Sequence, residues 1–130
     1  MATIEGHNLV VSRKKGTLPR VPFLAIKEKV LGKTYDLSVS FVSEREAQML
    51  NMTHRNKDYI PNTLSFSLSK NSGEIVLCLS AINREYKKFE MTKTTYLVFL
   101  LIHSMLHLKG FVHGGTMEKE EKKFLTFFTK

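Results

Sequence analysis

Residues 96–113 read Y-L-V-F-L-L-I-H-S-M-L-H-L-K-G-F-V-H, and the predicted fold depends on this stretch. The part from Tyr96 to Leu108 is mainly apolar and contains neither Gly nor Pro, which predicts a buried helix. It is shorter than the run of ~18 apolar residues that a membrane span needs. We therefore expect a helix inside a globular domain, and no membrane partner.

Three of the five histidines of the chain lie in this stretch, at His103, His107 and His113. On a helix, His103 and His107 stack on one face, one turn apart. Gly110 suits the left-handed residue that ends a helix, and the turn after it can bring His113 back toward the other two. Three neutral imidazoles with a fourth position open are typical of a catalytic zinc site. The spacing thus predicts one Zn²⁺ with three His ligands plus water or substrate.

Two other interpretations of the histidines are weighed against a catalytic zinc site. A histidine on an apolar helix is commonly a core residue bonded to a carbonyl group, but three histidines on one helix and turn favour a metal site. A metalloprotease helix carries a Glu directly after its first His as the general base, and this chain has Ser104 there. A peptidase of that type is disfavoured.

The rest of the chain predicts an alternation of strands and helices. Strands are expected at 3–11, 35–41, 64–68 and 74–79, the last two as an antiparallel hairpin. Helices are expected at 22–31, 43–54, 81–90, 96–108 and in the C-terminal segment that begins at 118. Ser43 with Glu46 is a capping box, and Thr92 can cap the histidine helix. The fold class is α/β (α+β), a single partly parallel sheet of about four strands packed with about five helices, including a zincin-like metal helix, in one domain spanning 1–130.

Composition adds weaker constraints. The net charge of +8 favours polyanionic partners, although a solvated basic surface would give the same value. Cys78 is the single cysteine, so neither an internal disulfide nor a disulfide-linked partner is expected. The N-terminus lacks the features of a signal peptide, which predicts a cytoplasmic protein.

Six positions of the histidine stretch follow the pattern H-x-x-L-H-L-x-G-x-x-H: His103, Leu106, His107, Leu108, Gly110 and His113. This pattern resembles the H-G-x-L-H-L-x-G-Y-D-H signature of the YbeY family, metal-dependent endoribonucleases of bacterial ribosomal RNA maturation. Ser104 stands where the family has Gly, Phe111 where it has Tyr, and Val112 where it usually has Asp.

A second stretch, residues 50–66, reads L-N-M-T-H-R-N-K-D-Y-I-P-N-T-L-S-F. It is similar to the other family signature, L-N-x-x-Y-R-x-K-D-x-P-T-D-V-L-S-F-P. The matching positions are Leu50, Asn51, Arg55, Lys57, Asp58, Leu64, Ser65 and Phe66. The departures include His54, Pro61, Asn62, Thr63 and Ser67. Loss of the acids at Asn62 and Val112 removes possible orienters of a ligand histidine, which can change metal affinity about 10 to 100 fold.

The resemblance implies an endoribonuclease that cleaves single-stranded RNA, chiefly ribosomal RNA precursors, with the 30S ribosomal subunit as a partner. It implies zinc on His103, His107 and His113, and catalytic roles for His107 and Arg55. A guanidinium such as that of Arg55 can hold a phosphate and stabilise the charge that grows at phosphorus; alternatively, Arg55 is a surface residue paired with Asp58 or Glu46. Ser65 could contribute a hydroxyl to RNA binding or could be only a polar strand position.

Two functions from other classes share these features. A zinc hydrolase of a small molecule or peptide would have the same three ligands. A non-catalytic or weakly active ribosome-assembly factor would have the same basic surface, and the lost acids favour it over the zinc hydrolase. Turnover of RNA by the metal-loaded protein separates both from the endoribonuclease.

Overall fold

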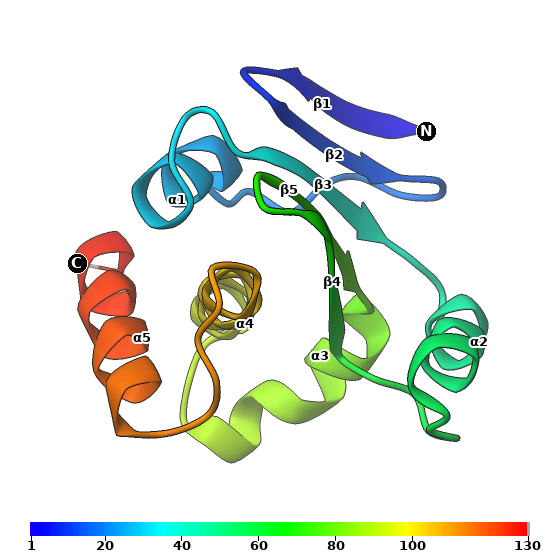
Figure 1. The fold of residues 1–130 in the computed structure, drawn as a ribbon. Helices are drawn as coiled ribbons and strands as arrows, with labels where there is room; N and C mark the ends of the chain where they lie inside the picture. The colour runs from blue at the N-terminus through cyan, green and yellow to red at the C-terminus, as the bar shows by residue number, and fades with distance from the viewer. Residues whose placement is uncertain (130) are drawn as a thin grey trace.

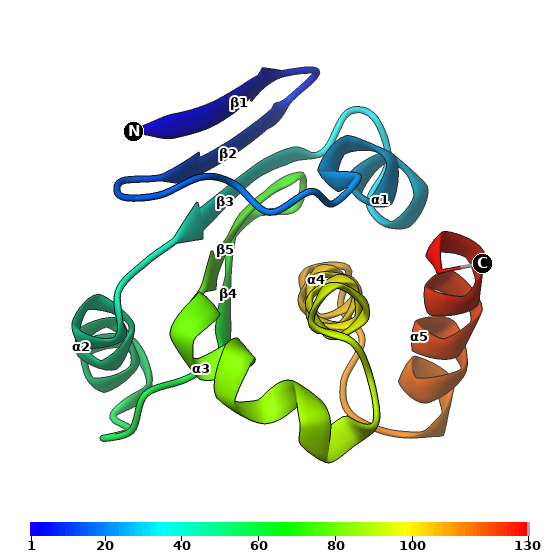
Figure 2. The same cartoon turned by 180° about the vertical axis from the view of Figure 1, so that it is seen from behind.

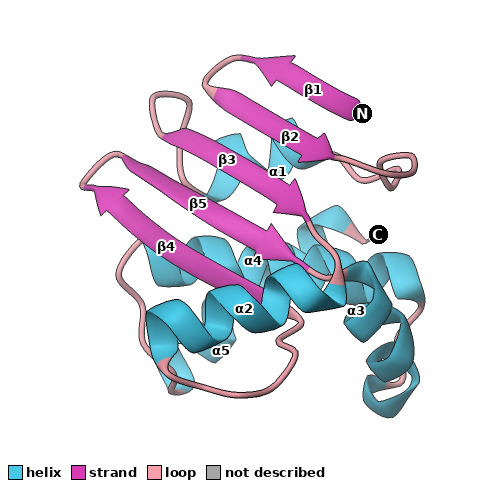
Figure 3. Ribbon diagram, turned by 90° about the vertical axis from the view of Figure 1, so that its right-hand side faces the viewer, coloured by secondary structure: helices cyan, strands magenta, loops and turns pink. Residues whose placement is uncertain are grey.

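A mixed sheet of five strands forms the centre of the computed structural model, which describes residues 1–129 (Figure 1). The strands are β1 (Ala2–Gly6), β2 (Leu9–Arg13), β3 (Asp36–Phe41), β4 (Thr63–Ser69) and β5 (Ser72–Leu77). Their order across the sheet is β1-β2-β3-β5-β4, as Figure 3 shows. The pairs β2/β3 and β3/β5 are parallel, while β1/β2 and β4/β5 are antiparallel. The predicted mixed sheet and the antiparallel hairpin are confirmed.

The single strand predicted over 3–11 is wrong, because this segment is the hairpin of β1 and β2. His7 and Asn8 form its turn with φ angles of 54° and 60°. Positive φ at both central residues is the geometry that matches the twist of a two-residue hairpin. The buried Lys27 donates a hydrogen bond to the His7 carbonyl oxygen at 3.3 Å, so a distant helix holds the turn. The sheet therefore has five strands where about four are predicted.

Helices cover both faces of the sheet. They are α1 (Phe23–Val30), α2 (Glu44–Arg55), α3 (Leu79–Glu85), the short 3-10 helix η1 (Tyr86–Phe89), α4 (Lys93–Leu108) and α5 (Gly115–Phe128). In Figures 1 and 2, α1, α4 and α5 lie on one side of the sheet and α2 lies on the other. The predicted caps are present: Ser43 accepts from the Glu46 amide at 3.2 Å, and Thr92 accepts from the Thr95 amide at 3.1 Å.

Helix α4 carries two of the three clustered histidines and lies between the sheet and α5 (Figure 2). This position explains why it is apolar around most of its circumference, since both sides of the helix contact other elements. Its buried residues include Leu101, Ile102, Met105 and Leu106, all fully covered. Among residues 1–129, no helix combines the length and apolar character that crossing a membrane requires.

Gly73 on β5 allows the C-terminal end of α4 to approach the sheet closely. A Cβ atom on Gly73 would lie 2.5 Å from the Tyr35 hydroxyl oxygen and 2.9 Å from Cδ2 of Leu108. Leu108 directly follows His107, so this contact sets the depth at which the histidine end of the helix sits on the sheet.

The first prediction concerns this close approach. Gly73→Ala should lower the free energy of unfolding by about 1–3 kcal/mol, because an added methyl group overpacks the contacts with Tyr35 and Leu108. Urea denaturation measures the change. Gly115→Ala is the matched control, since a Cβ at Gly115 meets no atom within 4 Å. Equal unfolding free energies for the two variants would contradict the role assigned to Gly73.

Candidate metal centre

The three predicted histidines come together at the end of α4. The ring centroids of His103 and His107 are 4.6 Å apart, and the His113 ring lies 5.3 Å from the first and 4.8 Å from the second. One ring nitrogen from each residue lies within 4.8 Å of the others, so the cluster could hold a metal ion. Gly110 ends the helix with a φ of 107°, as predicted, and the chain then turns to bring His113 back.

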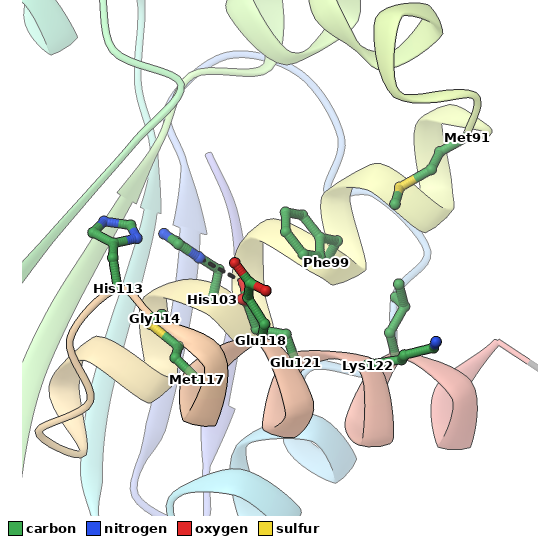
Figure 4. A pocket seen from close by; sticks show the side chains of 10 residues that line it. Met91, Phe99, His103, His113, Gly114, Met117, Glu118, Glu121 and Lys122 are labelled. Atoms are coloured by element: carbon green, nitrogen blue, oxygen red, sulfur yellow. Dashed lines mark hydrogen bonds and ion pairs between the residues drawn. The ribbon is translucent and has the colours of Figure 1, made fainter.

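His103 is oriented by a carboxylate that sequence reasoning missed. Its Nδ1 lies 2.6 Å from Oε2 of Glu121 on α5 (Figure 4). An ionised carboxylate only accepts, so Nδ1 carries the proton, and in the neutral ring Nε2 then carries the lone pair. Glu121 is only 8% exposed, so most of its side chain is covered by neighbouring residues. A metal-binding histidine typically has such an outer partner.

His107 is oriented by the backbone. Its Nδ1 donates to the Phe111 carbonyl oxygen at 3.1 Å, which again leaves the lone pair on Nε2. Burial lowers the pKa of His107, and the neighbouring His103 lowers this pKa further. Both effects favour the neutral imidazole, which is the form that binds a metal.

The two Nε2 atoms face each other at 3.2 Å. When both Nδ1 atoms donate and both rings are neutral, this contact brings two lone pairs together, which repel unless a cation or a proton lies between them. Two nitrogens bound to one tetrahedral zinc ion at 2.0–2.1 Å are about 3.3 Å apart. The donor set and its spacing therefore fit a divalent cation bound by imidazole nitrogens.

Comparison with known proteins gives the family. The family model described as Endoribonuclease YbeY matches residues 12–127. The chain belongs to the YbeY family. A protein of Cupriavidus metallidurans named Endoribonuclease YbeY is 32% identical over 120 residues, which cover 88% of this chain and 61% of that protein. A protein of the same name from Alkaliphilus oremlandii is 34% identical, with 71% of each chain covered.

A solved structure agrees with the fold. The solution structure of a Thermotoga maritima protein superposes with a TM-score of 0.59 and 27% sequence identity, covering 79% of this chain and 76% of that one. The chain spans about three fifths of the length of the Cupriavidus relatives, 61% and 59%. The YbeY assignment thus covers most of this chain but a smaller share of those relatives.

Arg55, the other residue that the YbeY resemblance singles out, does not share a cavity with the histidines. It is the last residue of α2, it is exposed, and it lines a separate cavity of about 320 Å³ with Asn62, Thr63 and Glu85. The alternative partners predicted for it have other contacts: Asp58 accepts a hydrogen bond from Gln48 at 3.0 Å, and Glu46 lies 4.0 Å from Lys14.

Two departures from the YbeY signatures contact each other. Thr63 on β4 and Ser104 on α4 share a hydrogen bond of 2.8 Å between their hydroxyl groups. Ser104 is 1% exposed, so its hydroxyl needs this partner. Ser65 lies two residues further along β4, half-buried and on the same face of the strand as Thr63. The bond ties the edge strand to the helix residue that follows His103.

A third departure, Asn62, belongs to a polar group beside Tyr96. Asn62 donates to Oε2 of Glu85 at 3.0 Å and to the Tyr96 hydroxyl at 3.3 Å, and Tyr96 donates to the same Oε2 at 2.9 Å. Burial and the hydrogen bond to Glu85 raise the pKa of Tyr96 to about 12. The family Asp at position 62 would place a second carboxylate against Glu85, so the amide suits this site.

The carboxylate beside the histidine cluster comes from α5 and not from the loop that carries Val112. Val112 is 78% exposed, whereas the carboxylate of Glu121 reaches His103 from α5. The signal for Glu121 was present in the sequence: Met117, Glu121 and Phe124 have the i, i+4, i+7 spacing of one helix face, and all three are buried. An acid on the apolar face of an amphipathic helix indicates a buried partner.

The second prediction concerns this orienting carboxylate. Glu121→Gln should weaken zinc binding about 10 to 100 fold, because the charged partner of His103 is lost. Competition with a chromophoric chelator measures the dissociation constant. Glu120→Gln is the control, since Glu120 pairs with Lys123 at 2.8 Å instead. If the Glu121→Gln variant binds zinc with the affinity of the unmodified protein, Glu121 has no role in metal binding.

The third prediction concerns the Thr63–Ser104 pair. Ser104→Ala alone should cost about 1–3 kcal/mol of unfolding free energy, because it leaves the Thr63 hydroxyl without its partner. Adding Thr63→Val should recover much of this loss, since removing both hydroxyls leaves no unpaired group. A double-mutant cycle from urea denaturation gives the coupling energy, expected at about 0.5–1.5 kcal/mol. Additive single effects would show that the two hydroxyls do not depend on each other.

Proposed function

We propose that this protein is a zinc-dependent endoribonuclease that is specific for single-stranded RNA and acts in ribosomal RNA maturation. The observation that carries the proposal is the pair of imidazole Nε2 atoms facing each other at 3.2 Å, each with its Nδ1 already bonded to an outer acceptor. Family membership adds that relatives in this family bear the name Endoribonuclease YbeY. The identity of the substrate, its cleavage by this protein and the binding partners of this protein are all part of the proposal.

His103, His107 and His113 are the proposed ligands. When bound, zinc supplies a Lewis acid that lowers the pKa of water and polarises a phosphoryl oxygen. Glu121 and the Phe111 carbonyl group hold the first two rings in the tautomer that presents Nε2. His113 is exposed and lies after the helix end, so it forms the solvent side of the site. No side chain is assigned as the general base.

Arg55 is proposed to hold an RNA phosphate, and its position suits a polymeric substrate. Its cavity includes Thr63, which is hydrogen-bonded to Ser104 next to His103. Thr63 and Ser104 thus link the wall of the Arg55 cavity to the helix that carries His103 and His107. In this proposal one RNA strand places one phosphate at Arg55 and another at the histidines, with Ser65 on the same face of β4 as Thr63. A small-molecule substrate would not need to contact both the Arg55 cavity and the histidine cluster.

The proposed substrates are ribosomal RNA precursors, and the proposed partner is the 30S ribosomal subunit. The excess of 20 Lys and Arg over 12 Asp and Glu favours binding to such polyanions. Unstacked single strands are easier for a small protein to hold than a duplex, because their bases can be splayed out.

The fourth prediction tests the proposed function with two variants and their controls. His107→Ala should lose bound zinc and RNA cleavage together. Arg55→Ala should keep its zinc and lose about 10²–10³ fold in cleavage rate, because one group that stabilises developing charge is gone. Elemental analysis and digestion of a labelled single-stranded RNA, with and without chelator, give both readouts.

The controls use residues of the same type. His54→Ala and Arg45→Ala, both in exposed positions on α2, should behave like the unmodified protein. If the zinc-loaded unmodified protein binds RNA but leaves it intact, the result would contradict the endoribonuclease assignment and favour a ribosome-assembly factor. Zinc content unchanged by His107→Ala would refute the ligand assignment.

A further inference from the structure

A cavity of about 390 Å³ lies directly beside the histidine cluster, between α4 and α5 (Figure 4). This volume is within the range of ~300–1,000 Å³ that small-molecule sites occupy. His103, His113 and Glu121 form one part of its wall, so the cavity is continuous with the candidate metal centre. The remaining lining residues are Met91, Phe99, Gly114, Met117, Glu118, Lys122 and Leu125.

Phe99 belongs to a row of stacked aromatic rings that leads from the surface to the cluster. The centroids of Phe89 and Tyr96 are 5.0 Å apart and those of Tyr96 and Phe99 are 6.4 Å apart, each pair with an interplanar angle of 14°. Phe99 in turn lies 5.9 Å from the ring of His103. Phe89 is 52% exposed, so the row begins in solvent.

The middle ring of the row is fixed in place. Tyr96 is 2% exposed, and its hydroxyl group is held by Glu85 and Asn62. Phe99 lies parallel to this anchored ring and presents an apolar surface to the cavity that it lines. Aromatic surfaces of this kind are where single-stranded nucleic acids stack their bases, at about 1–3 kcal/mol per base.

The polar rim of the cavity carries both kinds of hydrogen-bonding group. Glu118 and Lys122 are four residues apart on α5, hence on one face of the helix, and both line the cavity. Glu118 offers an acceptor and Lys122 a donor. A nucleobase presents both donors and acceptors on its edge and an apolar face above and below, which matches this combination of rim and wall.

We infer that this cavity binds one nucleobase of a single-stranded RNA, stacked against Phe99, while the adjoining phosphodiester lies at the histidine cluster. The inference rests on the proposed function and extends it. A base that enters a cavity between two helices cannot remain paired or stacked in a duplex. Selectivity for single strands then follows from the shape of this cavity.

The test measures binding separately from cleavage. The probe is a fluorescent 2′-O-methyl RNA hexamer of mixed sequence, checked to stay intact, and the zinc-loaded protein is titrated by fluorescence anisotropy. Phe99→Leu should weaken binding about tenfold, since the stacking surface is lost. The control is Phe127→Leu: Phe127 lies on the same α5 as the rim but is 54% exposed and contacts Lys29 instead. It should bind as the unmodified protein does.

A second pair of variants leaves the core untouched. Lys122→Gln should weaken binding several-fold, whereas Lys123→Gln, at the adjacent exposed lysine that pairs with Glu120, should not. If the Phe99→Leu protein fails to fold, the two lysine variants test the inference in its place. Equal affinities for Lys122→Gln and Lys123→Gln, or an unchanged affinity in a folded Phe99→Leu protein, would overturn the inference.

A parallel digestion of the unmodified RNA hexamer separates this inference from the proposed function. Cleavage by the unmodified protein together with Phe99-independent binding would support the nuclease activity and refute the nucleobase-binding site. Phe99-dependent binding without any zinc-dependent cleavage would support the base site and refute the nuclease. Photocrosslinking of a 5-iodouridine hexamer, mapped by peptide mass spectrometry, should mark Phe99 or Met91; crosslinks confined to other elements would count against the cavity.

Discussion

The packing of α4 between the sheet and α5 is the constraint on which the candidate site depends. Gly73 sets how closely the end of this helix approaches β5, and Glu121 reaches across from α5 to His103. The two imidazoles are therefore fixed from opposite sides: one outer nitrogen is bonded to α5 and the other to the backbone just past the helix end. A metal site built this way needs little rearrangement on binding, because its rings are already held.

Three positions that depart from the YbeY signatures have hydrogen-bond partners in the structure. Thr63 and Ser104 replace two residues without hydroxyl groups, and the two new hydroxyls bond to each other. Asn62 replaces an acid and donates to Glu85, which an acid could not do. Buried polar groups are tolerated where each has a partner, so such substitutions are expected to occur as pairs. These three departures are therefore compatible with a stably folded protein.

The sequence predicted much of the fold and of the histidine cluster because both depend on local spacing. The i, i+4 histidines and the glycine that ends the helix are fixed by helix geometry, so the convergence of His103, His107 and His113 was predictable. The β1–β2 hairpin was missed, because its turn at His7 and Asn8 lacks a Gly between two β-branched runs and is held by the distant Lys27. The Glu121–His103 and Thr63–Ser104 contacts were missed for a similar reason, because each joins two elements that tertiary packing brings together. The spacing of Glu121 on its helix indicated only that it is buried, not which residue it contacts. Arg55 was singled out from the motif, and the structure places it in a neighbouring cavity.

The central claim is that three imidazoles bind one cation through inward-facing nitrogens. X-ray absorption at the zinc edge, on protein loaded with one equivalent of Zn²⁺, tests it most directly. We predict three imidazole nitrogens at about 2.0–2.1 Å and a fourth light-atom ligand. A spectrum with fewer than three imidazoles, or with zinc surrounded mainly by water oxygens, would contradict the account.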